Sequence, residues 1–340
     1  MPSDLLLSWN DSAAKTAIAS FVERITKKNS PDFVPLDARI AVFDNDGTLW
    51  CEKPLPIQAD FLLRRLGVMA EHDPTLRSRQ PWKAVVENDW KWFSDVITKH
   101  YQGDDADLKV MGGGLIKAYE GTSIEEFEAT ASEFLHHAQH PELKRAYLEC
   151  AYRPMIELLG YLEAHGFTNY IASGGSRDFM RPVTSGLYGI TPEHVIGSTV
   201  ALEYRDDGEV ANVIHKAELD IFDDGPAKPV RIWSRIGRRP IFAAGNSNGD
   251  IAMLHFCKHP SRPSLSVLIN HNDGDREYAY QAGAEESLQR AEKHGWTVVS
   301  MKSDWNTVFV NQKDSRSGVV TERVGGVRAG SSKGKKVKTR

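Results

Sequence analysis

The chain has 340 residues, of which 41% are hydrophobic and 26% charged, with a net charge of −4 at pH 7. These values exclude a wholly disordered or collagen-like chain, and the length predicts two domains or one large domain with an insertion. No apolar run approaches the ~18 residues of a transmembrane helix, so we expect no membrane partner. The first residues lack the basic region of a signal peptide, and the three cysteines form no Cys-x-x-Cys pair. We therefore expect a reducing compartment, the cytoplasm, and no zinc site.

Charge is distributed unevenly along the chain. Residues 311–340 hold nine Lys or Arg and two Asp or Glu, a balance of +7, whereas the first 310 residues hold 33 basic and 44 acidic groups, a balance of −11. The acidic body argues against a nucleic-acid-binding surface. From Ser315 to Arg340 the tail has no aromatic residue, which predicts a disordered, solvated segment. Contact with nucleic acid or an acidic partner is the alternative, through the tail alone.

Helix-like and strand-like segments alternate through most of the chain. The expected helices cover Ala13–Ile25, Met155–His165 and Ile251–Phe256, with a further charged helix between the last two strands. The expected strands cover Ile40–Asp44, Asn169–Ala172, Pro240–Ala244, Ser266–Ile269 and Thr297–Met301. Short apolar runs between helices are typical of a parallel sheet covered on both faces. We therefore predict an α/β fold, a doubly wound parallel sheet with its ligand site at the carboxyl ends of the strands.

The segment Glu52–Cys150 does not follow this alternation. It has helical spacings, a break at Gly112–Gly114 and overlapping capping boxes that begin at Thr122 and Ser123. We expect an inserted helical subdomain whose core includes the tryptophans at positions 82, 90 and 92. The predicted units are residues 1–50 (N-terminal helix and first core strand), 51–150 (helical cap), 151–310 (the rest of the core) and 311–340 (basic tail).

Two carboxylates follow the first predicted strand directly. In the segment Val42–Trp50, Asp44 and Asp46 are two residues apart and precede Gly47 and Thr48. Alternation along a strand would place both carboxylates on the same side, and close carboxylates repel, so a cation or a shared proton is expected between them. A polar turn after a buried strand is the alternative interpretation.

Three later segments supply groups that suit a phosphate. Ser173 follows a strand, and the amides of Gly174 and Gly175 would open a helix, which favours phosphate oxygens. Lys228 is a lone lysine in a predicted loop, and Asn246 and Asp250 place acceptor oxygens four residues apart, a set that suits magnesium. The alternatives are an ordinary serine N-cap, a surface charge and a capped helix start.

In this order the four segments resemble the motifs of the haloacid dehalogenase superfamily of aspartyl-nucleophile hydrolases. The matching pattern is Asp-x-Asp-Gly-Thr from Asp44, then Ser173, then Lys228, then Gly-Asn-Ser-x-Gly-Asp up to Asp250. The resemblance runs from about residue 40 to residue 301 and implies a Rossmann-like core with a cap. A helical segment after the first motif, and a hairpin over Thr199–Ile221, resemble the phosphoserine-phosphatase-like branch.

The resemblance also implies roles for single residues. Asp44 would be the nucleophile that forms an aspartyl-phosphate, and Asp46 the general acid and base. Lys228 would neutralise charge, and the phosphoryl group would be held by Thr48, Ser173 and Gly174. Magnesium would be held by Asp44, by the backbone carbonyl of Asp46 and by the fourth motif, where Asn246 replaces the commoner Asp. Whether Asn246 or Asp250 is the direct ligand stays open.

A carboxylate at position 46 favours phosphatases and phosphomutases over dehalogenases and ion pumps. We expect a Mg²⁺-dependent phosphatase acting on a small phosphorylated metabolite. The alternatives are a phosphomutase, or a catalytically weak binding protein that uses its basic tail. Glu52 resembles the residue that reads an amino group in phosphoserine phosphatases, with its spacing shifted by one, and Arg177 is a second candidate substrate contact. Both also suit a surface or structural role, and the sequence says nothing about oligomeric state.

Overall fold

The computed structural model describes residues 6–101, 104 and 106–310, so the predicted tail lies outside the described residues. A seven-stranded sheet with the order β4-β3-β2-β1-β5-β6-β7 forms its centre. The strands are β1 (Ile40–Phe43), β2 (Thr168–Ser176), β3 (Val195–Asp206), β4 (Ala211–Ile221), β5 (Phe242–Gly245), β6 (Leu265–Asn270) and β7 (Thr297–Ser300). All neighbours pair in parallel except β3 and β4, which form an antiparallel edge. The predicted α/β fold is confirmed.

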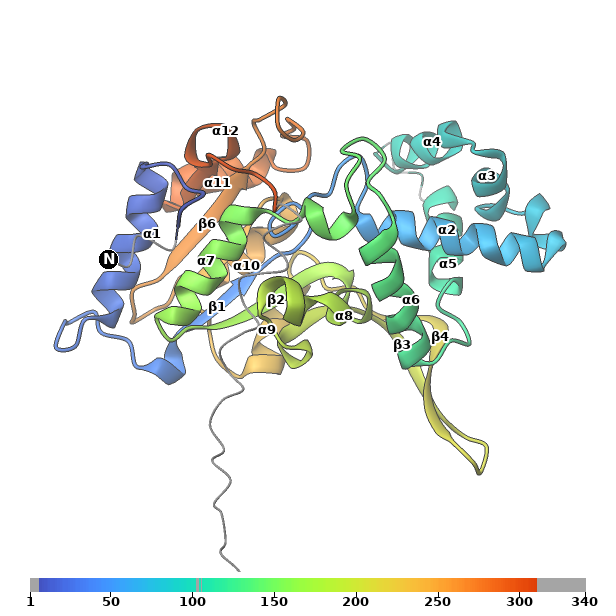
Figure 1. Ribbon diagram of the computed structural model, residues 1–340, viewed down its shortest axis with the longest axis horizontal. Coiled ribbons are helices and arrows are strands. Elements are labelled where there is room, and N and C mark those ends of the chain that lie inside the picture. Colours follow the sequence, from blue (N-terminus) through green and yellow to red (C-terminus); the bar gives the residue numbers. More distant parts are fainter. Residues whose placement is uncertain (1–5, 102–103, 105, 311–340) are drawn as a thin grey trace, which may run out of the picture.

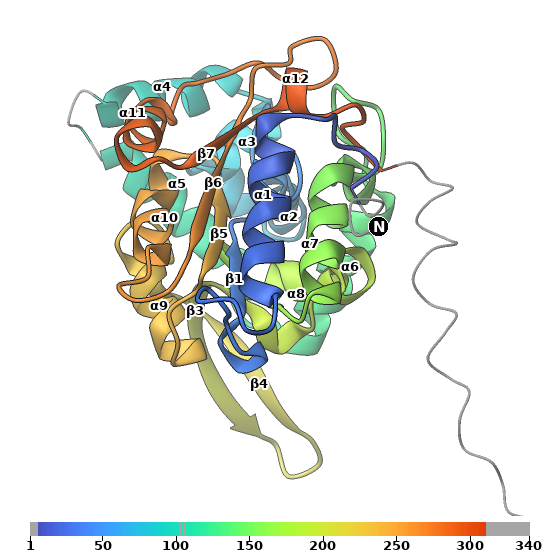
Figure 2. The same ribbon diagram turned by 90° about the vertical axis from the view of Figure 1, so that its left-hand side faces the viewer.

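Helices cover both faces of the sheet (Figures 1 and 2). One face carries α1 (Ala13–Thr26), α7 (Arg153–Ala164) and α8 (Arg177–Tyr188), and the other carries α9 (Ala227–Ile236), α10 (Ile251–Cys257) and α11 (Glu285–His294). The short α12 (Met301–Asp304) follows β7. Residues of β1 alternate between two apolar clusters, with Ala41 and Phe43 in one and Ile40 and Val42 in the other. This alternation explains why β1 is apolar throughout, because both of its faces are buried.

Among the described residues, five α-helices between β1 and α7 form a subdomain beside the sheet (Figure 1). They are α2 (Ile57–His72), α3 (Trp82–Glu87), α4 (Trp90–Tyr101), α5 (Ala106–Lys117) and α6 (Ile124–His137). Of the two capping boxes expected before α6, the one between Ser123 and Glu126 is formed. We call these helices the cap, and its predicted limits at residues 51 and 150 stay a prediction.

The hairpin of β3 and β4 extends beyond the sheet and reaches the cap (Figure 1). The His215 amide donates to the Thr122 carbonyl at 2.9 Å, and the Gly121 amide donates to the His215 carbonyl at 3.0 Å. Ser123 and Ile214 also form an isolated antiparallel bridge. The hairpin predicted over Thr199–Ile221 is therefore present, and it joins the core to the cap.

Two expectations about the cap are wrong. The chain does not break at Gly112–Gly114, because α5 runs through all three glycines and Gly114 lets the helix approach Pro81 closely. Trp90 is not in the cap core, since it is 61% exposed and contacts the ring of Phe93. Within the described residues, no helix is both long enough and apolar enough to cross a membrane.

The close approach of α5 to Pro81 predicts opposite effects of alanine at two adjacent glycines. A Cβ at Gly114 would lie 2.3 Å from Pro81 Cγ, whereas one at Gly113 would meet no atom within 4 Å. Gly114→Ala should therefore destabilise the cap by about 1–3 kcal/mol through overpacking. Gly113→Ala should stabilise it by about 0.5–1 kcal/mol through helix propensity. Thermal unfolding, with hydrogen exchange of α5, measures both, and equal shifts in the same direction would contradict this packing.

Candidate active site

The four predicted motifs meet at the carboxyl ends of adjacent strands. Asp44 follows β1, Ser173 lies in β2 and Asn246 follows β5, and β1 pairs with both of these neighbours. Lys228, from the first turn of α9, donates to Asp44 Oδ1 at 2.7 Å and to Asp250 Oδ1 at 2.6 Å. These three charged residues are at most 5% exposed. Groups as far apart in sequence as residues 44 and 250 thus form one buried site.

The buried charges at this site do not balance. Burial alone would lower the pKa of Lys228, but the carboxylates of Asp250 and Asp44 outweigh it and raise the pKa. Burial and the nearby Asp250 raise the pKa of Asp44 well above its ordinary value, although Lys228 acts in the opposite direction. One lysine therefore faces two carboxylates in a low-dielectric setting, which favours the arrival of a further positive charge.

Asp46 lies on the side of the site that faces β2. Its Oδ1 accepts a hydrogen bond from Trp50 Nε1 at 2.8 Å. A Cβ built on Gly175 would lie 3.3 Å from Asp46 Oδ2, from Ser173 Oγ and from Gln58 Oε1, so these three oxygens surround one small residue. Burial raises the pKa of Asp46 to about 6, despite the opposing Trp50 hydrogen bond. Such a group can exchange a proton near neutral pH.

Hydroxyl and amide groups line the space between the motifs. Thr48 and Ser173 are buried, and Ser173 Oγ accepts from the Gly175 amide at 3.0 Å. The Gly174 carbonyl accepts from Ser198 Oγ at 2.7 Å, which fixes the turn from outside. The expectation that the Gly174 and Gly175 amides open a helix is wrong, because β2 runs on to Ser176 and α8 begins at Arg177. The buried hydroxyls of Thr48 and Ser173 remain as polar groups that suit a phosphoryl group.

Asn246 is oriented by Glu52. The Asn246 amide nitrogen donates to Glu52 Oε1 at 3.0 Å, so its Oδ1 points to the opposite side, where it accepts from Thr48 Oγ1 at 3.2 Å. Thr48 Oγ1 also lies 3.4 Å from Asp44 Oδ2. Oxygens of Asp44 and Asn246 therefore lie on either side of the same hydroxyl, close enough to suit two ligands of one hard cation.

Both carboxylate oxygens of Asp250 accept hydrogen bonds from other residues. Its Oδ2 accepts from the amides of Asn246 and Ser247 and from the Ser247 hydroxyl, and its Oδ1 accepts from Lys228. Asp250 therefore positions the loop and the lysine, whereas Asn246 has the oxygen that is turned toward Asp44. Among the described residues, no group of three or more His, Cys, Asp or Glu side chains is arranged to hold a metal ion. A magnesium site here would rely on one carboxylate, one amide oxygen and a backbone carbonyl, a set that fits this ion when it keeps several waters.

Gly47 allows the first and fourth motifs to approach each other. Its φ is +73°, and a Cβ there would lie 2.1 Å from Asn246 Nδ2. The Gly47 carbonyl accepts from His271 Nε2 at 2.7 Å, and the His271 ring stacks on Tyr280. No larger side chain fits at position 47, so the Asp-Gly-Thr sequence is a packing requirement as well as a turn.

The cap reaches the site through Gln58. Its Oε1 accepts from the Ser176 amide at 2.7 Å, at the end of β2, and its Nε2 donates to the hydroxyl of Tyr119 in the cap. Burial raises the pKa of Tyr119 to about 12, so the hydroxyl remains protonated. Gln58 stands near the first motif in the sequence, which indicates a substrate contact or a structural role, but its partner Ser176 lies 118 residues away and could not be predicted.

Arg177, the second candidate substrate contact, lies beside the site in an ion pair with a neighbouring aspartate. Its guanidinium donates to Asp178 Oδ1 at 2.9 Å, and Asp178 also contacts Arg181 and His215. Burial opposes ionisation of Asp178, but the His215 and Arg177 hydrogen bonds and the arginine charges outweigh it, and the pKa of Asp178 falls to about 2. This network ties α8 to the hairpin beside the cap.

Two further residues near the site belong to none of the four motifs. Tyr280 donates to Glu52 Oε1 at 2.6 Å and so helps Glu52 to hold Asn246. Asp224 lies against Gly249, where a Cβ would come within 2.4 Å of its Oδ1, and it also lies near Gly174. Neither could be found from sequence, because both belong to loops without a regular pattern.

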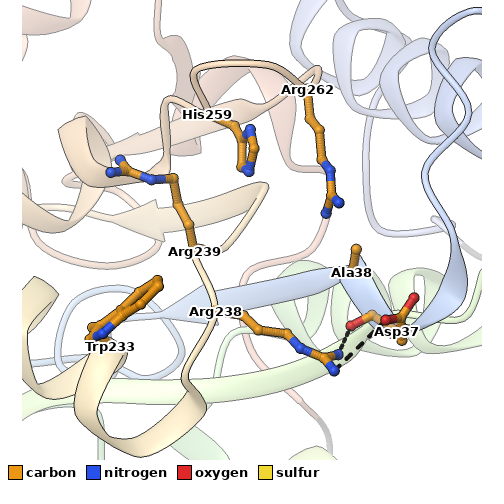
Figure 3. Close-up of a pocket in the computed structure, with 7 residues that line it drawn as sticks. All are labelled: Asp37, Ala38, Trp233, Arg238, Arg239, His259 and Arg262. Carbon is orange, nitrogen blue, oxygen red and sulfur yellow. Dashed lines mark hydrogen bonds and ion pairs between the residues drawn. The ribbon is translucent and has the colours of Figure 1, made fainter.

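A surface pocket of about 430 Å³ lies away from this site, near the amino ends of the central strands (Figure 3). In Figure 3 the Arg238 side chain points toward Asp37, which it contacts. The lining residues are Asp37, Ala38, Trp233, Arg238, Arg239, His259 and Arg262. None of them is a predicted site residue, and the candidate catalytic groups lie at the other, carboxyl ends of the strands.

A known family matches the part of the chain that contains these four segments. A family model described as haloacid dehalogenase-like hydrolase matches residues 41–255. No curated protein matches the sequence significantly.

Solved structures match over most of the chain at low identity. A functionally unknown protein from Anaerococcus prevotii matches with a TM-score of 0.53 and 15% identity, covering 87% of this chain and 94% of its own. A protein of unknown function from Bordetella pertussis matches with a TM-score of 0.49 and 16% identity, covering 77% and 98%. A probable phosphoserine phosphatase from Vibrio cholerae matches with a TM-score of 0.41 and 14% identity, covering 79% and 62%. At these identities the Anaerococcus likeness bears on the fold alone.

The Asp178 network predicts a pH-dependent contribution to stability. Because its pKa is lower in the folded protein than the ordinary 3.8, ionised Asp178 stabilises the fold above about pH 4. The contribution is lost as the pH falls toward 2. Asp178→Asn should lower the free energy of unfolding by about 2 kcal/mol at pH 7, and the difference from wild type should shrink below pH 4.

Urea unfolding at several pH values measures this difference. Asp275→Asn, at an exposed aspartate, is the matched control and should change stability little. A difference for Asp178→Asn that stays constant from pH 7 to pH 3 would contradict the prediction.

Proposed function

The chain belongs to the haloacid dehalogenase-like hydrolase family, and on that premise we propose that it is a phosphatase of the phosphoserine-phosphatase-like branch. It would hydrolyse a small phosphomonoester with magnesium, through an aspartyl-phosphate on Asp44. The observation that carries this proposal is the position of Lys228, which bridges Asp44 and Asp250 in a buried site that Asp46 also faces. We also propose a cytoplasmic location, in keeping with three free cysteines.

Asp44 is the proposed nucleophile. Its Oδ1 is held by Lys228, which leaves Oδ2 as the oxygen that attacks phosphorus, with Thr48 near it at 3.4 Å. Attack would form an acyl phosphate bond and release the alcohol, and water would then cleave that bond in a second step. Lys228 supports both steps because it offsets negative charge beside the phosphoryl oxygens.

Asp46 is the proposed general acid and base. It would protonate the leaving oxygen in the first step and take a proton from water in the second. A pKa of about 6 allows both protonation states near neutral pH. The Trp50 hydrogen bond to Oδ1 leaves Oδ2 directed toward Ser173, where a phosphoryl group held by Thr48, Ser173 and the Gly174 amide would lie.

Magnesium would be held by Asp44, the Asp46 carbonyl and Asn246, with Asp250 as a positioning residue. When bound, this ion supplies charge stabilisation for the phosphoryl oxygens. Glu52 would serve this set by turning the Asn246 oxygen toward Asp44. Its Oε1 is already engaged by Asn246 and Tyr280, so we propose that Glu52 supports the metal ligand rather than reading a substrate amino group.

The cap would exclude bulk water and select small substrates. Asp44, Thr48, Ser173 and Lys228 are all buried, and Gln58 of the cap accepts from the Ser176 amide beside them. We infer that a substrate enters when this contact opens.

The proposed nucleophile is tested by an isosteric substitution. Purified protein with Mg²⁺ should release phosphate from p-nitrophenyl phosphate or from a panel of small phosphomonoesters, and EDTA should stop the release. Asp44→Asn should lower turnover by roughly a thousandfold or more, because the amide cannot form the covalent bond. Asp37→Asn, at an exposed aspartate near the opposite edge, should leave turnover unchanged.

Other outcomes separate the alternatives. Turnover in Asp44→Asn above a tenth of wild type would refute the nucleophile. An isomeric phosphate ester as the product, without free phosphate, would identify a phosphomutase. Metal-loaded protein that turns over no ester, yet binds RNA in a salt-sensitive way, would favour a binding protein.

The contact of the cap predicts a role for Gln58. Gln58→Ala removes the hydrogen bond to the Ser176 amide, worth about 0.5–1.5 kcal/mol, and should lower kcat/KM about two- to tenfold. The exchange rate of the Ser176 amide should rise with it. Gln80→Ala is the matched control, because Gln80 Oε1 accepts from the Ala84 amide inside the cap, away from Ser176. Equal effects of the two variants on kcat/KM would show that Gln58 has no special role.

A further inference from the structure

Two chain segments connect the cap to the core, and they pair with each other. We call them the stem: Leu49–Cys51 on the way out and Cys150–Tyr152 on the way back. The Cys51 amide donates to the Cys150 carbonyl at 3.0 Å, and the Tyr152 amide donates to the Leu49 carbonyl at 2.8 Å. Trp50 and Ala151 form an antiparallel bridge between these two hydrogen bonds. Cys51 and Cys150 are therefore directly opposite residues of a short antiparallel ladder.

This pairing suits a disulfide bond. Directly opposite residues of a hydrogen-bonded antiparallel pair have Cα atoms about 5.5 Å apart, within the range of about 4.4–6.8 Å that a disulfide spans. The two thiols are near enough for Cys51 to hydrogen-bond to Cys150, and both residues are buried in the same apolar cluster. The third cysteine, Cys257, belongs to the cluster on the other face of the sheet. The two stem cysteines thus form a pair that Cys257 cannot join.

The stem is directly coupled to the proposed active site. The neighbours of Cys51 on either side are Trp50, whose Nε1 donates to Asp46, and Glu52, which accepts from Asn246. Alternation along an extended segment places these two side chains opposite to that of Cys51. A covalent bond at Cys51 would therefore restrain both contacts, in addition to fixing the two connections of the cap.

We propose that Cys51 and Cys150 are a site of reversible oxidative modification that controls movement of the cap. Hydrogen peroxide is the oxidant: one thiol attacks a peroxide oxygen, forming a sulfenic acid and releasing water. The second thiol then attacks that sulfur, forming the S–S bond and releasing a second water. Two electrons pass from the two thiols to one peroxide molecule. A small dithiol reverses the reaction by exchange.

Burial determines when this reaction occurs. The hydrogen bond to Cys150, together with burial, raises the pKa of Cys51 well above its ordinary value, so the thiolate is scarce while the stem is packed. Oxidation therefore requires opening of the stem, and a variant that weakens cap closure should react faster. The thiols of the closed protein should react slowly.

The experiment exposes the native full-length protein to hydrogen peroxide and maps peptides by mass without reduction. We expect a peptide pair joined through Cys51 and Cys150, about 2 Da lighter than the two thiol peptides, and an unmodified Cys257. Dithiothreitol should remove the link, and Cys150→Ser should abolish it. Gln58→Ala should form it several times faster than Gln80→Ala. The linked protein should also unfold at a higher Tm than the reduced protein.

Three results would overturn the proposal. The first is the absence of a Cys51–Cys150 link in both the folded wild type and folded Gln58→Ala, under oxidising conditions that do link the two cysteines in urea-unfolded protein. The second is a link that involves Cys257 instead.

The effect on turnover rests on the proposed phosphatase function: linked protein should lose turnover and regain it on reduction, while turnover of Cys150→Ser should be insensitive to peroxide. Unchanged turnover in fully linked protein is the third result, and it would refute control of the cap. Because the link is measured by mass, it can be detected whether or not the protein proves to be a phosphatase.

Discussion

The arrangement of the site depends on one buried ion pair network, in which Lys228 lies between Asp44 and Asp250. Removing two carboxylates and an ammonium group from water is costly, and only close mutual contacts offset the cost. Lys228 lies in the first turn of α9, Asp44 follows β1 and Asp250 directly precedes α10, so the network fixes three elements of the core relative to one another. It still leaves an excess of negative charge, which is why the same residues favour a cation and, with it, a phosphoryl group.

The fold and the main site residues could be predicted because they follow local rules. The apolar strand before Asp44 has to be buried on both faces, and parallel strands bring their carboxyl ends to one edge, so the motifs had to meet there. The supporting contacts could not be predicted in this way. Glu52, Tyr280 and Gln58 act through partners that lie more than one hundred residues away in the chain. Likewise, Gly114 continues a helix where its sequence suggested a break, because Pro81 packs against it.

The fourth motif illustrates how a neutral residue can replace a charged one. Asn246 carries one negative charge fewer than the aspartate common among relatives, yet its oxygen is held toward Asp44 by Glu52 and Thr48. An amide has two different ends, so it requires a partner that selects its orientation, whereas a carboxylate does not. Glu52 is such a partner, because its Oε1 accepts from the Asn246 amide nitrogen, and this supports the proposal that it positions Asn246.

The hairpin of β3 and β4 has a mechanical consequence. Its backbone hydrogen bonds at Thr122 and Gly121 attach the cap to the edge of the sheet, while the paired segments around Trp50 and Ala151 attach it near the middle. A body fastened at two separate points cannot swing freely; it rotates about the line that joins them. The long edge strand would have to twist with that rotation, so the hairpin would oppose large rotations of the cap.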